Sequence, residues 1–141
     1  MTGGRGKAGL VEKAESVSKA IRALKRLSAV EHKGRLARTS YLVEHIEARH
    51  EVYTAITYDS RHLSPVITLS LRGGVDIEAV PECEKRSFPV DVYQGLDAYQ
   101  AGELLEALSC PRAVISPLAR ALVNLWDLFI TSGMKMCEVN P

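Results

Sequence analysis

Residues 51–71 read EVYTAITYDSRHLSPVITLSL, and this stretch decides the fold class. Residues 51–59 are rich in β-branched and aromatic side chains with a period of two, and residues 65–71 form a second apolar run. Polar residues separate the two runs, and the paired glycines Gly73 and Gly74 follow the second. The stretch therefore predicts a β-hairpin that ends at the glycines.

Two helices are expected after the hairpin. Asp97 has the side chain of a helix N-cap, and apolar residues follow it at helical spacing until Pro111. A second helix is predicted to start at Ser116 and Pro117, because proline is favoured in the first turn, and to stop at Gly133. Its apolar residues also recur at helical spacing. Both helices should therefore have one face to bury.

The last residues predict another strand. Residues 134–141 read MKMCEVNP, and their alternation places Glu138 and Asn140 on one face. The mixed segment that contains Pro81 and Pro89 predicts a loop with little regular structure. Hairpin, last strand and helices together indicate an α+β fold with a largely antiparallel sheet covered by helices.

The first fifty residues have their own pattern. Apolar residues at helical spacing predict an amphipathic helix over residues 12–28. The polar, basic residues 31–38 predict a surface loop, and residues 41–43, Tyr-Leu-Val, predict a short strand. We expect the helix to be less secure than residues 41–141, because its apolar face is short of partners.

Composition limits the class of protein. The chain has 141 residues, 46% of them hydrophobic, and its 18 Lys and Arg against 17 Asp and Glu give a net charge of only +1. This balance favours neither nucleic acid nor a membrane as partner. Three cysteines without C-x-x-C spacing argue against a disulfide framework or a zinc site, and fit a cytoplasmic or mitochondrial matrix location. No signal peptide or transit peptide is visible.

The glycine-rich start, residues 4–9, fits the G-x-G-x-x-G pattern of a dinucleotide loop. That motif needs a preceding strand, and only three residues precede Gly4. The P-loop pattern fails too, because Ala8 follows Lys7 where Ser or Thr is required. Two interpretations of the loop stay open: a phosphate cradle, in which glycines admit backbone N–H groups and the cations neutralise charge, or a solvated terminus.

Four motifs in order indicate a family. They are GGRGKAG, TSYLVEHIEARHEVYTAITYDSR, LSLRGGVDIEAV and MCEVNP. Together they resemble the ATP-grasp region of the succinyl-CoA synthetase β subunit and its relatives, malate–CoA ligase, ATP-citrate lyase and citryl-CoA synthetase. The resemblance implies an incomplete ATP-grasp domain over residues 1–141. Residues 1–40 would be a remnant of the first lobe with the glycine-rich loop, and residues 41–141 would form the second lobe.

The resemblance assigns a role to eight residues. A site for ATP or GTP would lie at a hinge between the lobes, with an Mg²⁺ ligand and a residue at the phosphoryl-transfer centre. The implied ATP-binding residues are Gly4, Arg5, Gly6, Glu44, Glu47 and Glu51; the implied metal ligand is Asn140, and the implied catalytic residue is Glu138. An amide and a carboxylate oxygen suit Mg²⁺, which prefers hard oxygen ligands and shares them with phosphates.

The implied reaction is the NDP-forming joining of a carboxylic acid to CoA. In this family the phosphoryl group passes through a histidine of a CoA-binding α subunit, and none of the four histidines here matches it. The acid would be succinate by default, with citrate or malate as alternatives. The resemblance implies two partners, the α subunit and the CoA-ligase domain of the β subunit.

Three departures from the family keep a second hypothesis open. The family's strand with a phosphate-binding lysine has no counterpart before Gly4, and its CoA-ligase domain has none after Pro141. Arg72 stands before Gly73 and Gly74, where the family has an acidic residue. The chain is therefore expected to be a fragment. It is either the nucleotide-binding portion of a ligase that other segments complete, or a truncated remnant that acts only as a binding module.

Overall fold

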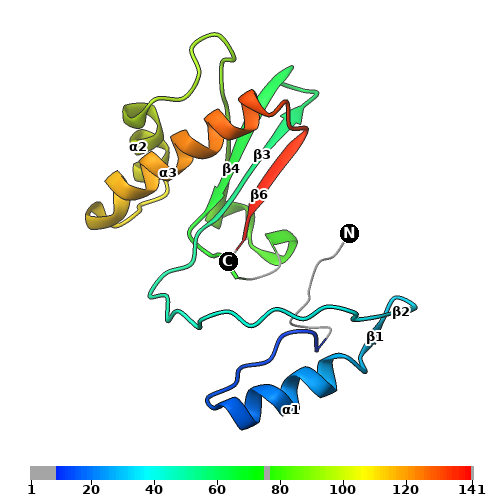
Figure 1. Ribbon diagram of the computed structural model, residues 1–141. Helices are drawn as coiled ribbons and strands as arrows, with labels where there is room; N and C mark the ends of the chain where they lie inside the picture. The colour runs from blue at the N-terminus through cyan, green and yellow to red at the C-terminus, as the bar shows by residue number, and fades with distance from the viewer. Residues whose placement is uncertain (1–8, 75–76, 141) are drawn as a thin grey trace. The chain divides into compact units, whose positions relative to one another are not determined.

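The computed structural model describes residues 9–74 and 77–140, and the chain divides into two units, Met1–Ala48 and Arg49–Pro141. Figure 1 shows the elements of both units. The first unit contains α1 (Val17–Leu27), β1 (Glu31–His32) and β2 (Arg35–Leu36). The second contains β3 (Tyr53–Asp59), β4 (Ser64–Ser70), η1 (Ile77–Ala79), η2 (Glu82–Glu84), β5 (Lys85–Pro89), α2 (Ala98–Ala107), α3 (Arg112–Thr131) and β6 (Met136–Val139).

The predicted hairpin is the centre of the second unit. Strands β3 and β4 pair antiparallel over their whole lengths, from Tyr53 opposite Ser70 to Asp59 opposite Ser64. Strand β5 joins the free edge of β4 and β6 that of β3, so the order is β5-β4-β3-β6 with every pair antiparallel. The predicted α+β class with a largely antiparallel sheet is confirmed.

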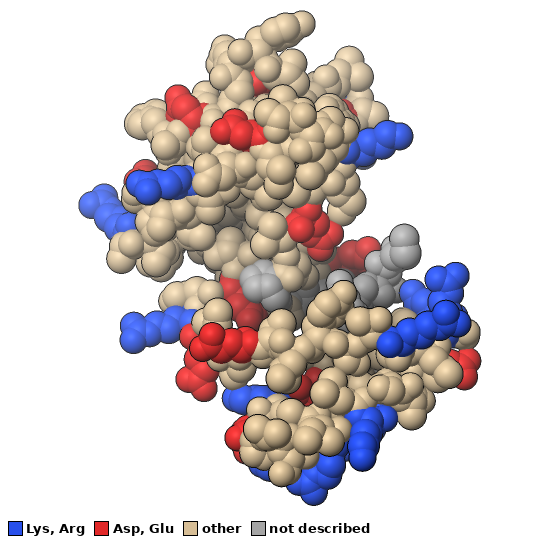
Figure 2. Space-filling view, viewed as in Figure 1, with Lys and Arg blue, Asp and Glu red and all other residues tan. Residues whose placement is uncertain are grey.

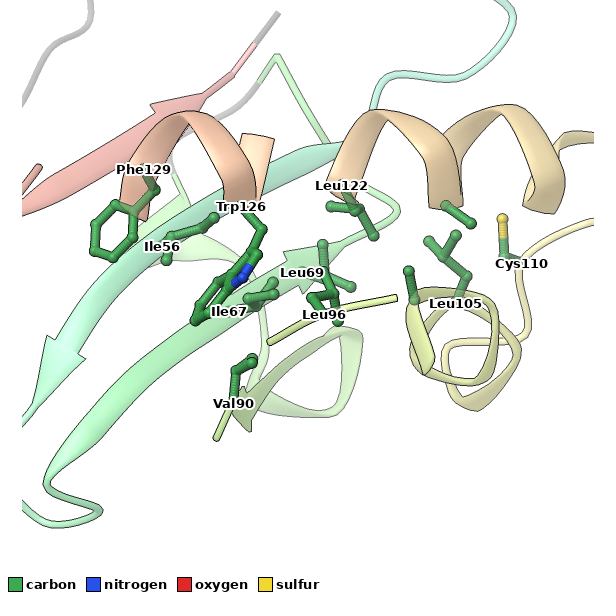
Figure 3. Packing of buried hydrophobic residues seen from close by; sticks show 12 residues of the cluster. Ile56, Ile67, Leu69, Val90, Leu96, Leu105, Cys110, Leu122, Trp126 and Phe129 are labelled. Atoms are coloured by element: carbon green, nitrogen blue, oxygen red, sulfur yellow. The ribbon is translucent and has the colours of Figure 1, made fainter. Parts of the chain in front are cut away.

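One face of this sheet holds the core. Figure 1 shows α2 and α3 against the same side of the strands, and Figure 3 shows α3 side chains pointing toward the hairpin. Ile56 and Ile67 lie opposite each other in the ladder and are fully buried. Trp126 and Phe129 of α3 belong to the same buried cluster. Burying apolar side chains of this size is the main favourable contribution to folding.

The two helices begin and end by local rules. The Asp97 carboxylate accepts the Gln100 N–H at 2.7 Å, and the Gln100 side chain accepts the Asp97 N–H at 3.0 Å, which forms the capping box that starts α2. Gly133 has a φ of +58° just after α3, which confirms the predicted stop. The predicted start of α3 is wrong, because the helix begins at Arg112. Pro117 lies inside it, where proline lacks the N–H of a regular helical hydrogen bond.

By length and composition alone, α3 is the one helix among the described residues that could cross a membrane. Part of its apolar side packs in the core of the second unit. Ala119, Leu122, Trp126 and Phe129 are buried in the core of the second unit. Core packing therefore accounts for these four residues of α3.

Two further predictions concern the edge strands of the second unit. The expected last strand is confirmed as β6. The segment expected to be a loop contains a strand, because residues 85–89 pair with β4 as β5. This strand lies at the edge of the sheet, where only one neighbour supplies hydrogen bonds, and most of its residues are exposed. Its sequence therefore lacks the apolar alternation that marks a half-buried strand.

Two elements of the first unit differ from expectation. Its helix begins at Val17, because the Ser16 hydroxyl accepts the Lys19 N–H and caps it there. The expected loop 31–38 is a short hairpin, β1–β2, whose turn residues Lys33 and Gly34 both have positive φ. Ala23 is the only buried residue of α1, so the helix has little core of its own.

The predicted strand at residues 41–43 is wrong. These residues have no regular secondary structure in the described part of the chain, and all three side chains are exposed. A strand is defined by hydrogen bonds to a neighbour, and apolar side chains alone do not supply them. The proposed remnant-lobe boundary at residue 40 stays a prediction.

Candidate functional site

The face of the sheet that is turned away from the helices carries several polar side chains. Residues opposite each other in antiparallel ladders project to the same side, and one row across the four strands reads Ser87, Thr68, Ala55 and Glu138. The hydroxyl oxygens of Thr68 and Ser87 are hydrogen-bonded at 2.9 Å. The adjacent row contains the core residues Ile56 and Ile67, which face the helices. Glu138 therefore projects from the face that is turned away from α2 and α3.

At the end of this face, three segments far apart in sequence meet at the paired glycines. The Gly73 N–H donates to the backbone oxygen of Glu51 at 2.7 Å. The Gly74 N–H donates to the side-chain oxygen Oδ1 of Asn140 at 2.8 Å. A Cβ placed on Gly74 would overlap the Glu51 carboxylate, so that carboxylate lies directly against the glycine. We call Glu51, Gly73, Gly74 and Asn140 the glycine junction.

The structure thus brings together two of the predicted site residues, and a third lies close to them in the chain. Glu51 and Asn140 belong to the glycine junction, and Glu138 lies on β6 two residues before Asn140, which follows the end of that strand. Their oxygens are the ligand type that Mg²⁺ prefers. Among residues 9–74 and 77–140, no three His, Cys, Asp or Glu side chains form a group that could hold a metal on their own. The donor set fits a metal that takes part of its ligands from phosphates.

The other predicted residues belong to the first unit or lie outside the described residues. Glu44 and Glu47 belong to the first unit and are exposed in a segment without regular structure. Gly4, Arg5 and Gly6 lie outside the described residues. Their roles in nucleotide binding stay predictions.

Tyr53 lies beside Glu138 on the same face of the sheet. Glu138 is opposite Ala55 in the ladder, and Tyr53 precedes Ala55 by two residues. Burial raises the pKa of the Tyr53 phenol above its ordinary value, and the negative charge of Glu138 raises this pKa further. The phenol ionises less readily in the folded than in the unfolded chain. Its contribution to stability is therefore complete below pH 10 and is lost as the pH rises through the folded-state pKa.

Substituting Glu138→Gln is expected to lower the pKa of Tyr53 without returning it to the ordinary value, because the charge is removed and the burial stays. The measurement is a pH titration of tyrosine ring carbons by NMR. Tyr99 is the internal control, since its raised pKa arises chiefly from a hydrogen bond to Glu103 on α2. A Tyr53 pKa that does not respond to the substitution would contradict the placement of Glu138.

Arg72, the departure from the family pattern, has a partner in the structure. Its guanidinium forms an ion pair with the Glu84 carboxylate at 2.8 Å, and both side chains are substantially exposed. Ser70, which is fully buried, donates its hydroxyl to the backbone oxygen of Glu84 at 2.9 Å and accepts the Arg72 N–H at 3.1 Å. These bonds connect the segment before the glycine junction to η2.

Sequence reasoning missed the role of the paired glycines. The sequence marks Gly73 and Gly74 as the end of a strand and as part of a family motif but assigns them no contact, although Gly74 contacts two predicted site residues. A pair of glycines is itself a signal, because it permits close approach of another segment as well as a turn. Nothing in the sequence specified which segment would approach.

Comparison with known proteins agrees with this architecture. The family model described as ATP-grasp domain matches residues 1–141. The chain therefore belongs to the ATP-grasp family.

Within that family the chain is similar to succinate–CoA ligases. It is 35% identical to subunit β 2 of the ADP-forming enzyme of Archaeoglobus fulgidus, over 100% of this chain and 38% of the relative. It is 32% identical to subunit β of Halobacterium salinarum, over 99% of this chain and 37% of the relative. The structure of ATP citrate lyase from Methanothrix soehngenii, in complex with citrate and coenzyme A, superposes with a TM-score of 0.72 at 26% identity. That match covers 96% of this chain and 32% of the other. The chain spans about a third of the length of these relatives.

Proposed function

We propose that this chain binds ATP or GTP together with Mg²⁺, as the nucleotide-binding portion of an NDP-forming carboxylate–CoA ligase of the succinyl-CoA synthetase β type. The observation that carries the proposal is the glycine junction. It unites Glu51 and Asn140, which the family resemblance names independently as nucleotide and metal residues, within one hydrogen-bonded arrangement.

In this proposal Asn140 would hold the metal, and the Glu138 carboxylate would lie at the phosphoryl-transfer centre. Bound Mg²⁺ supplies neutralisation of the phosphate charge. The task of the protein groups is to bind the nucleotide and to orient its terminal phosphate, since catalysis of phosphoryl transfer depends mainly on positioning and electrostatics. Gly4, Arg5 and Gly6 would cover the phosphates, and Glu44 and Glu47 would contact the rest of the nucleotide.

The distribution of charge supports a polyphosphate ligand. Residues 1–48 contain ten Lys and Arg against five acids, whereas residues 49–141 contain eight against twelve. Figure 2 shows Lys and Arg side chains spread over the first unit. A local excess of cations attracts an anionic ligand even though the chain as a whole is almost neutral.

The proposal assigns the histidine that receives the phosphoryl group to a CoA-binding α subunit, as the resemblance implies. The acid is succinate by default, and a citrate- or malate-CoA ligase or an ATP-citrate lyase relative is the alternative. A binding module without catalysis is the competing function. As a truncated remnant it would not bind nucleotide, so nucleotide affinity separates the two functions.

Isothermal titration calorimetry tests the proposal. We expect saturable binding of ATP or GTP at up to millimolar concentrations in Mg²⁺, and a loss of this binding in EDTA. Inorganic triphosphate is the control, because attraction to cations alone would bind it as well as the nucleotide. The absence of binding of both nucleotides at millimolar concentration would overturn the proposed function for this chain.

A further inference from the structure

A side chain at Gly74 would disturb its surroundings in two ways. Its φ of +67° lies in the left-handed region, and the Glu51 carboxylate takes the space where a Cβ would be. Other described glycines with positive φ differ in this respect. Gly9, Gly34 and Gly133 have no heavy atom within 4 Å of the Cβ position. A Cβ at residue 74 would therefore strain the backbone and displace the Glu51 carboxylate from its place.

The backbone of Gly74 also orients Asn140. Asn140 follows the last residue of β6, Val139, so the strand ladder does not determine the rotation of its side chain. An asparagine amide has an oxygen that accepts and a nitrogen that donates. The Gly74 N–H can bond only to the oxygen, and its 2.8 Å bond to Oδ1 turns that atom toward the glycine junction. A carbonyl oxygen has two lone pairs, so it can accept an N–H and ligate a cation at the same time.

Contacts with neighbouring segments hold the turn that contains Gly74. Gly73 donates to the Glu51 backbone oxygen, and a Cβ on Gly73 would come within 2.8 Å of backbone atoms of Glu51 and Val52. The bonds of Ser70 and the ion pair of Arg72 with Glu84 hold the residues just before the glycines. These contacts position the backbone of Gly74, against which the side chains of Glu51 and Asn140 lie.

We infer that Gly74 is a positioning residue of the nucleotide–metal site. It positions the Glu51 carboxylate by leaving room for it, and it orients the Asn140 oxygen by donating its N–H. Both groups would then act on the same Mg²⁺-bound phosphate. This inference rests on the proposed function. It adds that the alignment of the two side chains depends on a residue that contributes no side chain.

The test compares Gly74→Ala with Gly133→Ala. Both substitutions place a Cβ on a residue with positive φ, but only the first collides with a carboxylate. We expect Gly74→Ala to weaken Mg-ATP binding by at least about tenfold in calorimetry, as loss of a supporting contact to a metal ligand does. Gly133→Ala should stay within about twofold of the parent, because an alanine there has no carboxylate to displace.

Two measurements do not depend on nucleotide. The Gly74 amide proton should be protected from exchange in the parent chain and should lose that protection in Asn140→Ala. In denaturant unfolding, Gly74→Ala combined with Glu51→Ala should cost less than the sum of the single substitutions, because removal of the Glu51 carboxylate makes room for the new Cβ. The Asn140→Ala measurement leaves residue 74 intact, so it remains decisive if Gly74→Ala does not fold.

The outcomes separate the two ideas. If the parent chain binds no Mg-nucleotide, the proposed function is lost. The positioning role is overturned if the parent binds and Gly74→Ala binds equally well, or if Gly74 is unprotected in the parent, or if the unfolding costs of the Glu51 and Gly74 substitutions simply add.

Discussion

Substitution of Phe129 by alanine is expected to lower the free energy of unfolding by about 3–5 kcal/mol, the range for truncating a large buried aromatic side chain. Phe129 is fully buried in α3, with ring centroids 5.4 Å from Tyr58 and 6.3 Å from Trp126. Its removal would leave a cavity between the helix and the sheet and would end both ring contacts. Domains have only about 5–15 kcal/mol of stability, so a large part would be lost.

Leu128→Ala is the matched control for this substitution. Leu128 precedes Phe129 on the same helix but is 47% exposed. Leucine and alanine are both good helix formers, so this change should cost under about 1 kcal/mol. Urea unfolding followed by circular dichroism measures both variants. Similar midpoints for Phe129→Ala and the parent chain would show that α3 does not pack on the sheet as described.

The second large effect is expected at the other face of the sheet. Asn140→Ala should weaken the binding of ATP or GTP in Mg²⁺ by at least about tenfold, since even the partners that support metal ligands contribute about 10- to 100-fold in metal affinity. Asn140→Asp should retain more affinity than Asn140→Ala, because the carboxylate keeps an oxygen where the metal and the Gly74 N–H need one.

A control and a second condition make the Asn140 test specific. Asn124 is an exposed asparagine of α3, and Asn124→Ala should leave nucleotide affinity unchanged. In EDTA, Asn140→Ala and the parent chain should bind nucleotide equally weakly, because the contribution of Asn140 requires the metal. An Asn140→Ala chain with parental affinity in Mg²⁺ would refute the assignment of Asn140 as a metal ligand.

Predictions from sequence succeeded where local interactions decide the structure. The Asp97 cap, the Gly133 stop and the β3–β4 hairpin depend on residues a few positions apart, and all three are confirmed. The start of α3 was misjudged by the same local logic, because Pro111 and Pro117 both resemble helix starts and only the structure shows Pro117 inside the helix.

Predictions were weaker where a segment's partner decides its structure. The apolar residues 41–43 form no strand, whereas the mostly polar residues 85–89 form β5 because the edge of β4 accepts them. The pattern of apolar residues predicted neither outcome. Hydrogen bonding to a neighbour, which is not encoded by composition, made the difference.

The same division holds for the candidate site. Sequence by itself determined the α+β class, the start of α2, the end of α3 and the list of candidate oxygen-bearing residues, because periodicity, capping and motif order are properties of short stretches. Only the tertiary structure decided that Glu51 and Asn140 meet at Gly74. That meeting depends on β6 pairing with β3, which brings the Asn140 oxygen to an N–H donor 66 residues earlier in the chain. A contact of this range joins segments that are far apart in the sequence, so no local pattern records it.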